Sequence, residues 1–372
     1  MGTAARSRGP SSPCRVAGTH AAALRFSMAH RSHPAVRSLV VAAIGISIAA
    51  LVRSVVRRAR RLDLAGRVVI VTGGSRGLGL CIAEELGRRG ARVAICGRDR
   101  GALEAAERRL RALGVDVLAR PCDLGDRGQA AAFVERVAAE WGRLDVLVNN
   151  AGVIHVEPAA TVTLEGIDEA LRSNFWSAVH ATFASLPHLR AEGEGIIVNV
   201  VSVGGRVAVP HLLGYSASKF ALMGFSEGLE VELRKEGVRV VTVVPGLMRT
   251  GSYYNAEFGG QAERELSWFS VSASLPLVTV SARRAARRVV RAIEDRERLV
   301  HVGWPAALAS LAHGLAPRLV LLVAELADRL LPAPDGAGRA PRRGRDIASA
   351  LKGSALLRLG DRAACDNNEG PA

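Results

Sequence analysis

The sequence predicts a doubly wound α/β fold in which one parallel sheet of seven strands carries helices on both faces. Between residues 62 and 303, short runs rich in β-branched residues alternate with stretches of helical periodicity, which is the pattern of βαβ units. A stretch of this length with seven such runs fits one domain. Hydrophobic residues make up 49% of the chain and charged residues 23%, so wholesale disorder is excluded.

The seven runs are mostly apolar, as expected of strands that are buried on both faces of a parallel sheet. We predict strands at Val68–Val71, Arg92–Cys96, Val115–Ala119, Leu144–Val148, Ile196–Val201, Val238–Val244 and Arg298–Val302. Helical stretches lie between them, for example Leu78–Arg89, Gly101–Leu113 and Gln129–Trp141. Because strands and helices alternate, the sheet is expected to be covered on both faces.

The segment before this domain divides into two parts. Residues 1–34 are rich in Arg, Ser, Ala and His and lack apolar periodicity, so we expect them to be disordered. Residues 35–61 contain the uncharged run Ser38–Val52, which is followed by five arginines. We expect a membrane anchor through residues 35–56, with the Arg-rich flank favouring a cytoplasmic location for the following domain.

The uncharged run is shorter than the roughly 20 apolar residues of a spanning helix, so other interpretations stay open. Arg37 and Arg53 lie near its ends, where long side chains can reach the membrane interface. A cleaved signal peptide is disfavoured because no cleavage site of small residues precedes the arginines. The remaining alternatives are a transit peptide, a buried core helix, and a helix in the oligomer interface of a soluble cytoplasmic enzyme.

The sequence after the domain is expected to form two short amphipathic helices and a loose tail. Leucines recur at helical spacing in residues 304–332, and Pro317 interrupts them. These helices are expected to pack on the domain or on a second subunit, or to contact a membrane surface. Residues 333–372 are rich in Pro, Gly and Arg, which is typical of a linker and a loose tail.

The formal net charge of +15 does not indicate a nucleic-acid partner, because the charge is unevenly distributed. Residues 1–61 carry eleven arginines and no acidic residue, whereas residues 62–303 carry 30 basic and 28 acidic residues. No folded basic face is therefore implied. The five cysteines have no paired spacing, which argues against a disulfide framework and a zinc site. The histidines predict no metal site either, because their spacing does not match that of metal ligands. These histidines are His155, His180, His188 and His211.

A glycine-rich turn follows the first predicted strand. The run Thr72-Gly73-Gly74-Ser75-Arg76-Gly77-Leu78-Gly79 passes directly into a helical pattern. Its glycines allow a tight turn and a close approach of the backbone to a pyrophosphate, and the helix N-terminus offers free N–H groups. Ile82 stands where the last glycine of the G-x-G-x-x-G fingerprint would be. The turn is a candidate dinucleotide site, and a plain tight turn is the alternative.

The pattern Thr-Gly-x-x-x-Gly-x-Gly resembles that of the short-chain dehydrogenase/reductase family, NADP(H)-preferring type. Over residues 62–303 the other family motifs follow in order: Asn149-Asn150-Ala151-Gly152, Asn174, Ser202, Tyr215-x-x-x-Lys219, and Pro245-Gly246 with Thr250. Any one motif is weak evidence, whereas five in register are specific. The resemblance implies a Rossmann-type sheet, a small-molecule carbonyl or alcohol substrate, a nicotinamide cofactor, and a dimer or tetramer through the helices that contain Asn174 and Tyr215.

The residue types themselves indicate acid–base chemistry at Tyr215. Tyr215 and Lys219 lie one helical turn apart, so their side chains share a face. A tyrosine with a pKa of about 10 is a poor acid–base catalyst near neutrality, and a lysine cation beside it lowers that pKa. Tyr215 is the expected general acid–base, and Ser202 holds the same substrate oxygen. By resemblance, Lys219 also holds the nicotinamide ribose, and Asn174 positions a water that relays the proton.

Further cofactor contacts are implied by the resemblance. They are expected at Gly73, Ser75, Arg76, Gly77, Leu78, Gly79, Arg98, Asp123, Asn150, Ala151, Gly152, Tyr215, Lys219, Pro245 and Thr250. Asp123 would contact the adenine, and Asn150–Gly152 would line the adenosine side. Pro245 and Thr250 would meet the nicotinamide carboxamide, whereas Asn149 is expected to be structural.

The end of the second strand favours NADP(H) over NAD(H). An acidic residue there would accept the ribose 2′-hydroxyl of NAD and repel a 2′-phosphate. This strand instead leads into Arg98, whose planar cation suits a phosphate, and Arg76 in the turn adds a second charge. If Arg98 is merely solvated, either cofactor would be accepted.

Together these features predict a membrane-associated, NADP(H)-dependent oxidoreductase that interconverts a ketone or aldehyde and an alcohol. Residues 251–280, where the family carries its substrate lid, are rich in large apolar side chains, which suggests an apolar, lipid-like substrate. These side chains are Tyr253, Tyr254, Phe258, Trp268, Phe269 and Leu275. The alternative function is a catalytically idle scaffold or sensor that binds NADP(H).

Overall fold

The computed structural model describes residues 61–335, 340–348 and 358–370, together with four isolated positions in the N-terminal segment. The expected disordered segment 1–34 and nearly all of the expected anchor 35–61 lie outside the described residues. Among the helices of the described ranges, none is long and apolar enough to cross a membrane. The chain divides into two compact units, residues 1–56 and 57–372, and the second contains all the elements discussed below.

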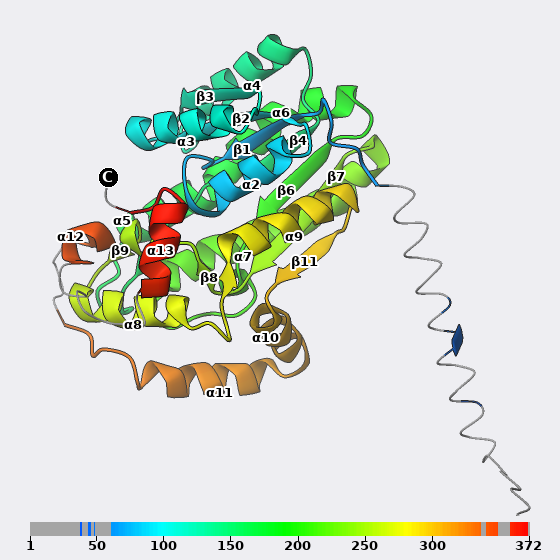
Figure 1. The fold of residues 1–372 in the computed structure, drawn as a ribbon. Helices are drawn as coiled ribbons and strands as arrows, with labels where there is room; N and C mark the ends of the chain where they lie inside the picture. The colour runs from blue at the N-terminus through cyan, green and yellow to red at the C-terminus, as the bar shows by residue number, and fades with distance from the viewer. Residues whose placement is uncertain are drawn as a thin grey trace, which may run out of the picture. The chain divides into compact units, whose positions relative to one another are not determined.

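A seven-stranded parallel sheet forms the centre of this unit (Figure 1). In the order in which they lie side by side, its strands are β11 (Leu299–Val302), β7 (Arg239–Pro245), β6 (Ile196–Val200), β4 (Val146–Asn149), β1 (Val68–Thr72), β2 (Arg92–Gly97) and β3 (Val117–Pro121). All neighbouring strands run parallel. The predicted fold class, a doubly wound seven-stranded Rossmann-type sheet, is confirmed.

The strand order contains a reversal that positions the site. From β1 the chain moves outward through β2 to β3, and then returns to β4 on the other side of β1. Ligands of open α/β sheets bind at the carboxyl ends of the strands that flank such a reversal. The glycine-rich turn follows β1, and Asn150–Gly152 follow β4, so two predicted motifs lie at this point.

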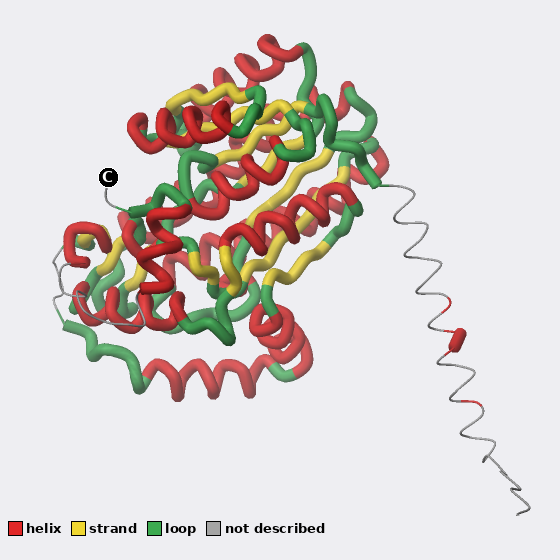
Figure 2. The backbone as a smooth tube through the Cα atoms, in the orientation of Figure 1, coloured by secondary structure: helices red, strands yellow, loops and turns green. Residues whose placement is uncertain are grey.

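Helices cover both faces of the sheet, which Figure 2 shows as red tubes on either side of the yellow strands. One face carries α2 (Gly77–Gly87), α3 (Arg100–Ala112) and α9 (Ala282–Glu294). The other carries α4 (Arg127–Trp141), α6 (Ser177–Ala191) and α7 (Leu213–Leu233). Every residue of β1, β4 and β6 is buried between these layers.

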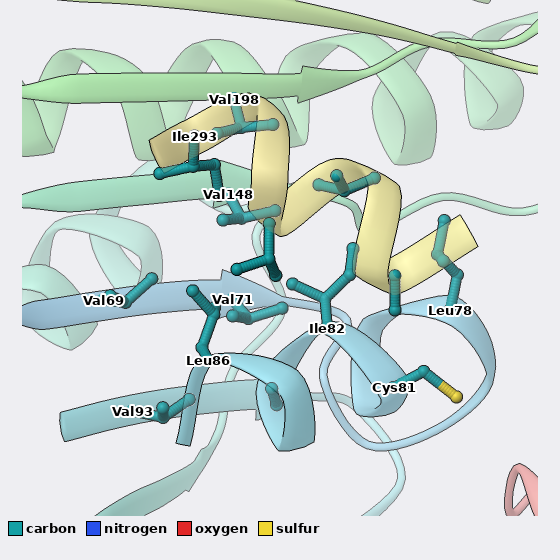
Figure 3. Close-up of a cluster of buried hydrophobic side chains, with 14 of the residues drawn as sticks. Val69, Val71, Leu78, Cys81, Ile82, Leu86, Val93, Val148, Val198 and Ile293 are labelled. Carbon is teal, nitrogen blue, oxygen red and sulfur yellow. The ribbon is translucent and has the colours of Figure 1, made fainter. Parts of the chain in front are cut away.

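Apolar side chains hold the layers together, because the burial of apolar surface is the dominant favourable contribution to folding. In Figure 3, Ile82 and Leu86 of α2 and Ile293 of α9 share one buried cluster with Val71 and Val148 of the sheet.

The first turns of two helices are capped by the residue that precedes each helix. Asp99 caps α3 and Asp126 caps α4, each accepting a backbone N–H of the first turn.

Further elements lie around the C-terminal edge of the sheet. The helices among them are α5 (Leu164–Leu171), α8 (Ala262–Ser274), α10 (Trp304–Leu315), α11 (Pro317–Asp328), α12 (Gly344–Ile347) and α13 (Arg358–Asp366). The strands are β5 (His155–Val156), β8 (Met248–Arg249), β9 (Glu257–Phe258), β10 (Val280–Ser281) and β12 (Arg342–Arg343). They form two small sheets, in which β8 pairs with β10, and β9 lies between β5 and β12.

The helices α10 and α11 meet at Pro317, which is the first residue of α11. Their leucines do not pack on the domain. Each of the following is more than half exposed: Leu308, Leu311, Leu315, Leu319, Leu321, Leu322, Leu326 and Leu330. The expectation of packing on the main domain is therefore wrong for these side chains.

The C-terminal residues differ from the loose tail that the composition predicts. Residues 340–348 and 358–370 pack on the domain: β12 pairs with β9, and Ile347 and Ala364 are almost fully buried. The expectation of a loose tail is therefore wrong for these two ranges. Many of their contacts are hydrogen bonds from polar side chains, which leave no apolar periodicity in the sequence.

Candidate active site

Close backbone contacts shape the glycine-rich turn between β1 and α2. Gly73 has a φ of 63°, and a Cβ there would lie 2.9 Å from Ala151 Cα. A Cβ at Gly79 would collide with the carbonyl oxygen of Gly73. Any larger residue would push the turn away from the end of β4, so glycine is required at both positions.

Thr72 ties the turn to the end of β4. Its Oγ1 donates to the carbonyl of Val148 (3.2 Å) and accepts the N–H groups of Asn150 (2.9 Å) and Ala151 (3.0 Å). The Asn150 side chain donates back to the Thr72 carbonyl (3.1 Å). Asn149 is buried and donates to side chains of α6 and β6, which ties the end of β4 to its neighbours.

The N-terminus of α2 already faces a carboxyl group of the chain. Gly77, the first residue of α2, donates its N–H to the carbonyl of Asn367 (2.8 Å). Gly77 has a φ of 58°, and a Cβ there would collide with Oε1 of Glu369. A carboxylate of the chain therefore lies against the helix N-terminus, which favours anions through its free N–H groups and dipole. The same features fit the pyrophosphate of a dinucleotide.

Ser202, Tyr215 and Lys219 come together beyond the end of β6. Ser202 Oγ accepts the N–H of Gly204 (3.0 Å), and a Cβ at Gly204 would lie 3.2 Å from the Tyr215 ring. Lys219 Nζ donates to the carbonyl of Val200 (3.1 Å) and lies 5.9 Å from the centre of the Tyr215 ring. Sequence reasoning missed Gly204, because no motif marks a glycine whose only requirement is to leave space for an aromatic ring.

Burial dominates the pKa values of this pair. It raises the pKa of Tyr215 above 10.0, and a hydrogen bond with Ser202 acts in the opposite direction. Burial lowers the pKa of Lys219 from 10.5 to about 8. The expected lowering of the Tyr215 pKa is therefore wrong for this structure, since burial outweighs the neighbouring groups. At neutral pH a protonated phenol and a lysine cation lie side by side.

Asn174 joins the same group of residues. It lies in a π-helical turn, Arg172–Trp176, between α5 and α6, and such turns are frequent at functional sites. Its Oδ1 accepts the N–H of Val153 (2.8 Å), and its Nδ2 donates to the carbonyl of Val153 (3.0 Å). A Cβ at Gly152 would collide with Asn174 Oδ1 and lie 3.5 Å from Lys219 Nζ. Asn174 and Lys219 therefore flank the backbone that follows β4.

The two arginines expected at a 2′-phosphate each have an acidic neighbour. Arg76 contacts Oδ2 of Asp99 (2.7 Å) and Oδ1 of Asn255 (2.6 Å). A backbone N–H of α3 and the Arg76 side chain hold the pKa of Asp99 below its usual value. The Arg98 side chain is 51% exposed and lies 3.5 Å from Glu169. Asp99, which directly follows Arg98, is the acid that the fold brings to Arg76.

The other predicted cofactor residues lie along the same edge of the sheet. Asp123 accepts the N–H of Gly125 (3.0 Å) and pairs with Arg172. Pro245 ends β7, and Thr250 follows β8. Leu78 differs from the rest, because its side chain is buried in the core cluster beneath the turn, so any contact it makes with a ligand must come from its backbone.

The segment 251–280 forms a hydrophobic cluster of its own. Tyr253, Phe258 and Phe269 are buried together with Val156 and Leu212. The expectation that these three rings offer an apolar surface to substrate is wrong, because they pack against one another. Trp268, Tyr254 and Tyr215 lie at the edge of this cluster.

His211 links α8 to the start of α7. It adopts a φ of 60°, and its Nδ1 lies 3.0 Å from both carboxylate oxygens of the buried Glu265. The His211 side chain is only 7% exposed. A left-handed conformation at a non-glycine residue is maintained only by surrounding contacts, and the bond to Glu265 is one of them.

The comparisons with known proteins agree with this geometry. Residues 67–257 match the sequence model of the family described as short chain dehydrogenase. SadH of Mycobacterium tuberculosis, whose name describes an oxidoreductase, is 31% identical over 65% of this chain and 87% of its own. A Streptomyces coelicolor protein whose name describes a ketoacyl reductase is 33% identical over 67% of this chain and 94% of its own. The chain belongs to the short-chain dehydrogenase/reductase family, which is a family of oxidoreductases.

Two further proteins are similar to this chain, one in sequence and one in structure. A tropinone reductase homolog of Arabidopsis thaliana is 37% identical over 51% of this chain and 71% of its own. The crystal structure of a short chain dehydrogenase/reductase from Burkholderia phymatum in complex with NAD has a TM-score of 0.61 and 22% identity. It covers 75% of this chain and all of that chain, which shows the shared fold.

Proposed function

We propose that the protein uses a nicotinamide dinucleotide, preferentially NADP(H), to interconvert a ketone or aldehyde and an alcohol. The observation that carries the proposal is the group Ser202, Tyr215 and Lys219 at the switch point of the sheet. It lies at the same edge as a glycine-rich turn against which the carboxyl group of Glu369 lies. The names of the Streptomyces and Arabidopsis relatives, which describe reductases of carbonyl compounds, support the same reaction class.

Tyr215 moves the proton in this mechanism. In the direction of reduction, the phenol donates its proton to the carbonyl oxygen while the carbonyl carbon accepts a hydride. The bound cofactor supplies that hydride. Ser202 hydrogen-bonds the same oxygen, and the Gly204 N–H that donates to Ser202 Oγ orients the hydroxyl. In the reverse direction Tyr215 takes the proton from the alcohol.

Lys219 and the turn would hold the cofactor. An ammonium group has three donors, and the bond to the Val200 carbonyl uses one of them, so others can reach ribose hydroxyls. Ser75–Gly79 would hold the phosphates through backbone N–H groups. Asn174 maintains the backbone at Val153 through two hydrogen bonds, and we propose that it also positions the water of the proton relay.

The preference for NADP(H) is supported by Arg98 and Arg76 at the end of β2 and in the turn. Asp99 opposes it, because its carboxylate partly neutralises Arg76. Tryptophan fluorescence of the full chain should show binding of NADPH at least tenfold tighter than that of NADH, which is about 1.4 kcal/mol. Arg98→Ala should remove that preference, whereas the control Arg111→Ala, at the other end of α3, should retain it. Equal affinities in the native chain would overturn the choice of NADP(H).

The substitution Tyr215→Phe tests the enzymatic function against the idle scaffold. Removal of the phenolic oxygen removes the proton donor, so kcat should fall by about 10²–10⁴-fold. The dissociation constant for NADPH should stay within a factor of about two, since the ring remains. Measurement of both quantities on purified protein separates the two functions. Undetectable turnover in the native chain, together with normal NADPH binding, would support the scaffold.

We propose in addition that the enzyme attaches to a membrane through residues 35–56, faces the cytoplasm and acts on an apolar, lipid-like substrate. The proposal is supported by the uncharged run Ser38–Val52 and by the exposed leucines of α10 and α11. A substrate screen that compares long-chain with small water-soluble ketones tests the substrate class. Turnover of the small ketones alone would contradict it.

A dimer or tetramer through α6 and α7 is the assembly we propose. Large apolar side chains on these helices and on the π-helical turn support it: Trp176, Phe183, Phe220 and Val231 are 40–78% exposed. Light scattering of the native chain should give a mass of two or four subunits, and Phe183→Asp should lower it. A monomeric native chain would contradict this assembly.

A further inference from the structure

The end of the described chain lies on the glycine-rich turn. In Figure 1, α13 is drawn in red between α8 and the loop that leads into α2. The carbonyl of Asn367 accepts the N–H of Gly77 (2.8 Å), and its side-chain amide donates to the carbonyl of Thr250 (3.2 Å). Asn368 donates to the carbonyls of Ser75 (2.8 Å) and Ala102 (3.0 Å). The segment therefore forms hydrogen bonds both with the glycine-rich turn and with Thr250, which follows β8.

Glu369 reaches the N-terminus of α2 itself. Its side chain is buried, with Oε1 against Cα of Gly77, and the Asn255 amide donates to its carboxylate. Two cations act on it, Arg76 from the turn and Arg345 from α12. A buried carboxylate at a helix N-terminus, next to arginine, meets the same groups that bind a phosphate.

The residues under this segment are those expected to hold the cofactor. Ser75, Gly77 and Thr250 are directly hydrogen-bonded to Asn367 or Asn368, and Arg76 interacts electrostatically with Glu369. A Cβ at Gly77 would strike Glu369, so a phosphate oxygen cannot lie there at the same time.

We propose that residues 358–370 are a built-in competitor of the cofactor, with the Glu369 carboxylate in the place of a cofactor phosphate. The inference rests on the proposed function, since it requires a dinucleotide in the turn. The dinucleotide binds only to chains in which the segment has left, so its apparent dissociation constant equals the intrinsic one divided by the fraction of chains that are open. Release exchanges the segment's hydrogen bonds for bonds to water, and the closed form is therefore reversible.

Hydrogen–deuterium exchange on the native full chain tests this without any substitution. Addition of NADPH should increase exchange in residues 358–370 and decrease it in Ser75–Gly79, because the cofactor replaces the segment. A segment that instead closes over the bound cofactor would exchange more slowly when NADPH is added, and that result would overturn the proposal. Unchanged exchange in residues 358–370 at saturating NADPH would overturn it as well.

Two variants of the full chain test the same point by affinity. Glu369→Ala removes the carboxylate, and Asn367→Ala combined with Asn368→Ala removes the side-chain bonds without a change of charge. Both should bind NADPH about fivefold tighter or more, whereas Glu325→Ala, with the same charge change on exposed α11, should match the native chain. Equal or weaker binding by both variants would overturn the competitor. Binding of neither NADPH nor NADH by any of these proteins would instead remove the proposed function, and the competitor with it.

Discussion

The chemistry of Tyr215 and Lys219 depends on their burial. A charged form is disfavoured away from water, so burial raises the pKa of the phenol and lowers that of the lysine to about 8. Tyr215 is therefore held as a proton donor at neutral pH, which suits the reduction of a carbonyl group. Lys219 remains a cation until the solution becomes mildly alkaline, and this has a measurable consequence.

The KM for NADPH is expected to rise as the pH passes about 8. Lys219 is charged below that pH and neutral above it, because its pKa lies below the usual 10.5. A neutral amine forms weaker hydrogen bonds to ribose than an ammonium does. Steady-state kinetics across the neutral and alkaline range measure the effect. In Lys219→Arg, whose charge does not titrate in this range, the alkaline rise should disappear, and a native KM that stays constant well above pH 8 would argue against the assignment.

Gly204 is predicted to position the Tyr215 ring. In Gly204→Ala the new Cβ would lie 3.2 Å from the Tyr215 ring, so the ring must move by a few tenths of an ångström. We expect kcat to fall by about tenfold, since small misplacements of reacting groups are costly, with the NADPH dissociation constant unchanged. The control Gly224→Ala on α7 has open space at its Cβ and should keep full activity. Equal kcat values in the two variants would show that Gly204 does not position the ring.

At the scale of elements, the docking of α13 is decided by polar contacts and one buried carboxyl. Burial raises the pKa of Glu369 to about 7, although Arg76, Asn255 and Arg345 favour its charged form. Asp99, which pairs with Arg76, reduces the effect of that cation. The docked carboxyl therefore binds protons more tightly than the free one, whose pKa is near 4.5. Docking is strongest below this lower value and weakens as the pH rises through about 7.

The affinity for NADPH should therefore improve between about pH 5 and pH 7, because the competing segment is released. In Glu369→Gln the residue does not titrate, and this improvement should be lost. Fluorescence titrations of both proteins at each pH give the comparison, and the variant corrects for the titration of the 2′-phosphate itself. Parallel pH profiles of the two proteins would contradict the role of Glu369.

At the scale of the whole molecule, α10 and α11 expose an apolar surface that the domain does not cover. The exposed leucines extend along both helices, and α10 carries no Asp, Glu, Lys or Arg. Surfaces of this kind bind membranes or other protein chains. The membrane interpretation agrees with the uncharged run near the N-terminus.

The native chain is expected to sediment with vesicles that contain anionic lipid. Leu319→Lys combined with Leu322→Lys should lower the bound fraction about threefold or more, because both side chains are exposed and apolar. Leu113→Lys with Leu299→Lys makes the same change at exposed leucines of the domain and should bind as the native chain does. If the α11 variant binds vesicles normally but light scattering gives a lower mass than that of the native chain, the apolar surface of α10 and α11 is a subunit interface.

Much of the site was accessible from the sequence because its residues belong to short, local patterns. Tyr215 and Lys219 share a helix face, and the turn Thr72–Gly79 joins one strand to the next helix. Asp99 and Gly204 could not be found in this way, because their importance comes from partners that lie far along the chain or from the space they leave. The aromatic residues of 251–280 were misjudged for the same reason: composition does not reveal which side of a ring meets solvent.

The sequence by itself determined the parallel α/β sheet and the family, because alternating periodicity and motif spacing are local properties that the fold preserves. Only the tertiary structure decided the pKa values of Tyr215 and Lys219, the partners of Arg76 and Arg98, and the exposure of α10 and α11. It alone brought Glu369 to Gly77, 292 positions earlier in the chain. These depend on burial and on distances between remote segments, which no local pattern records.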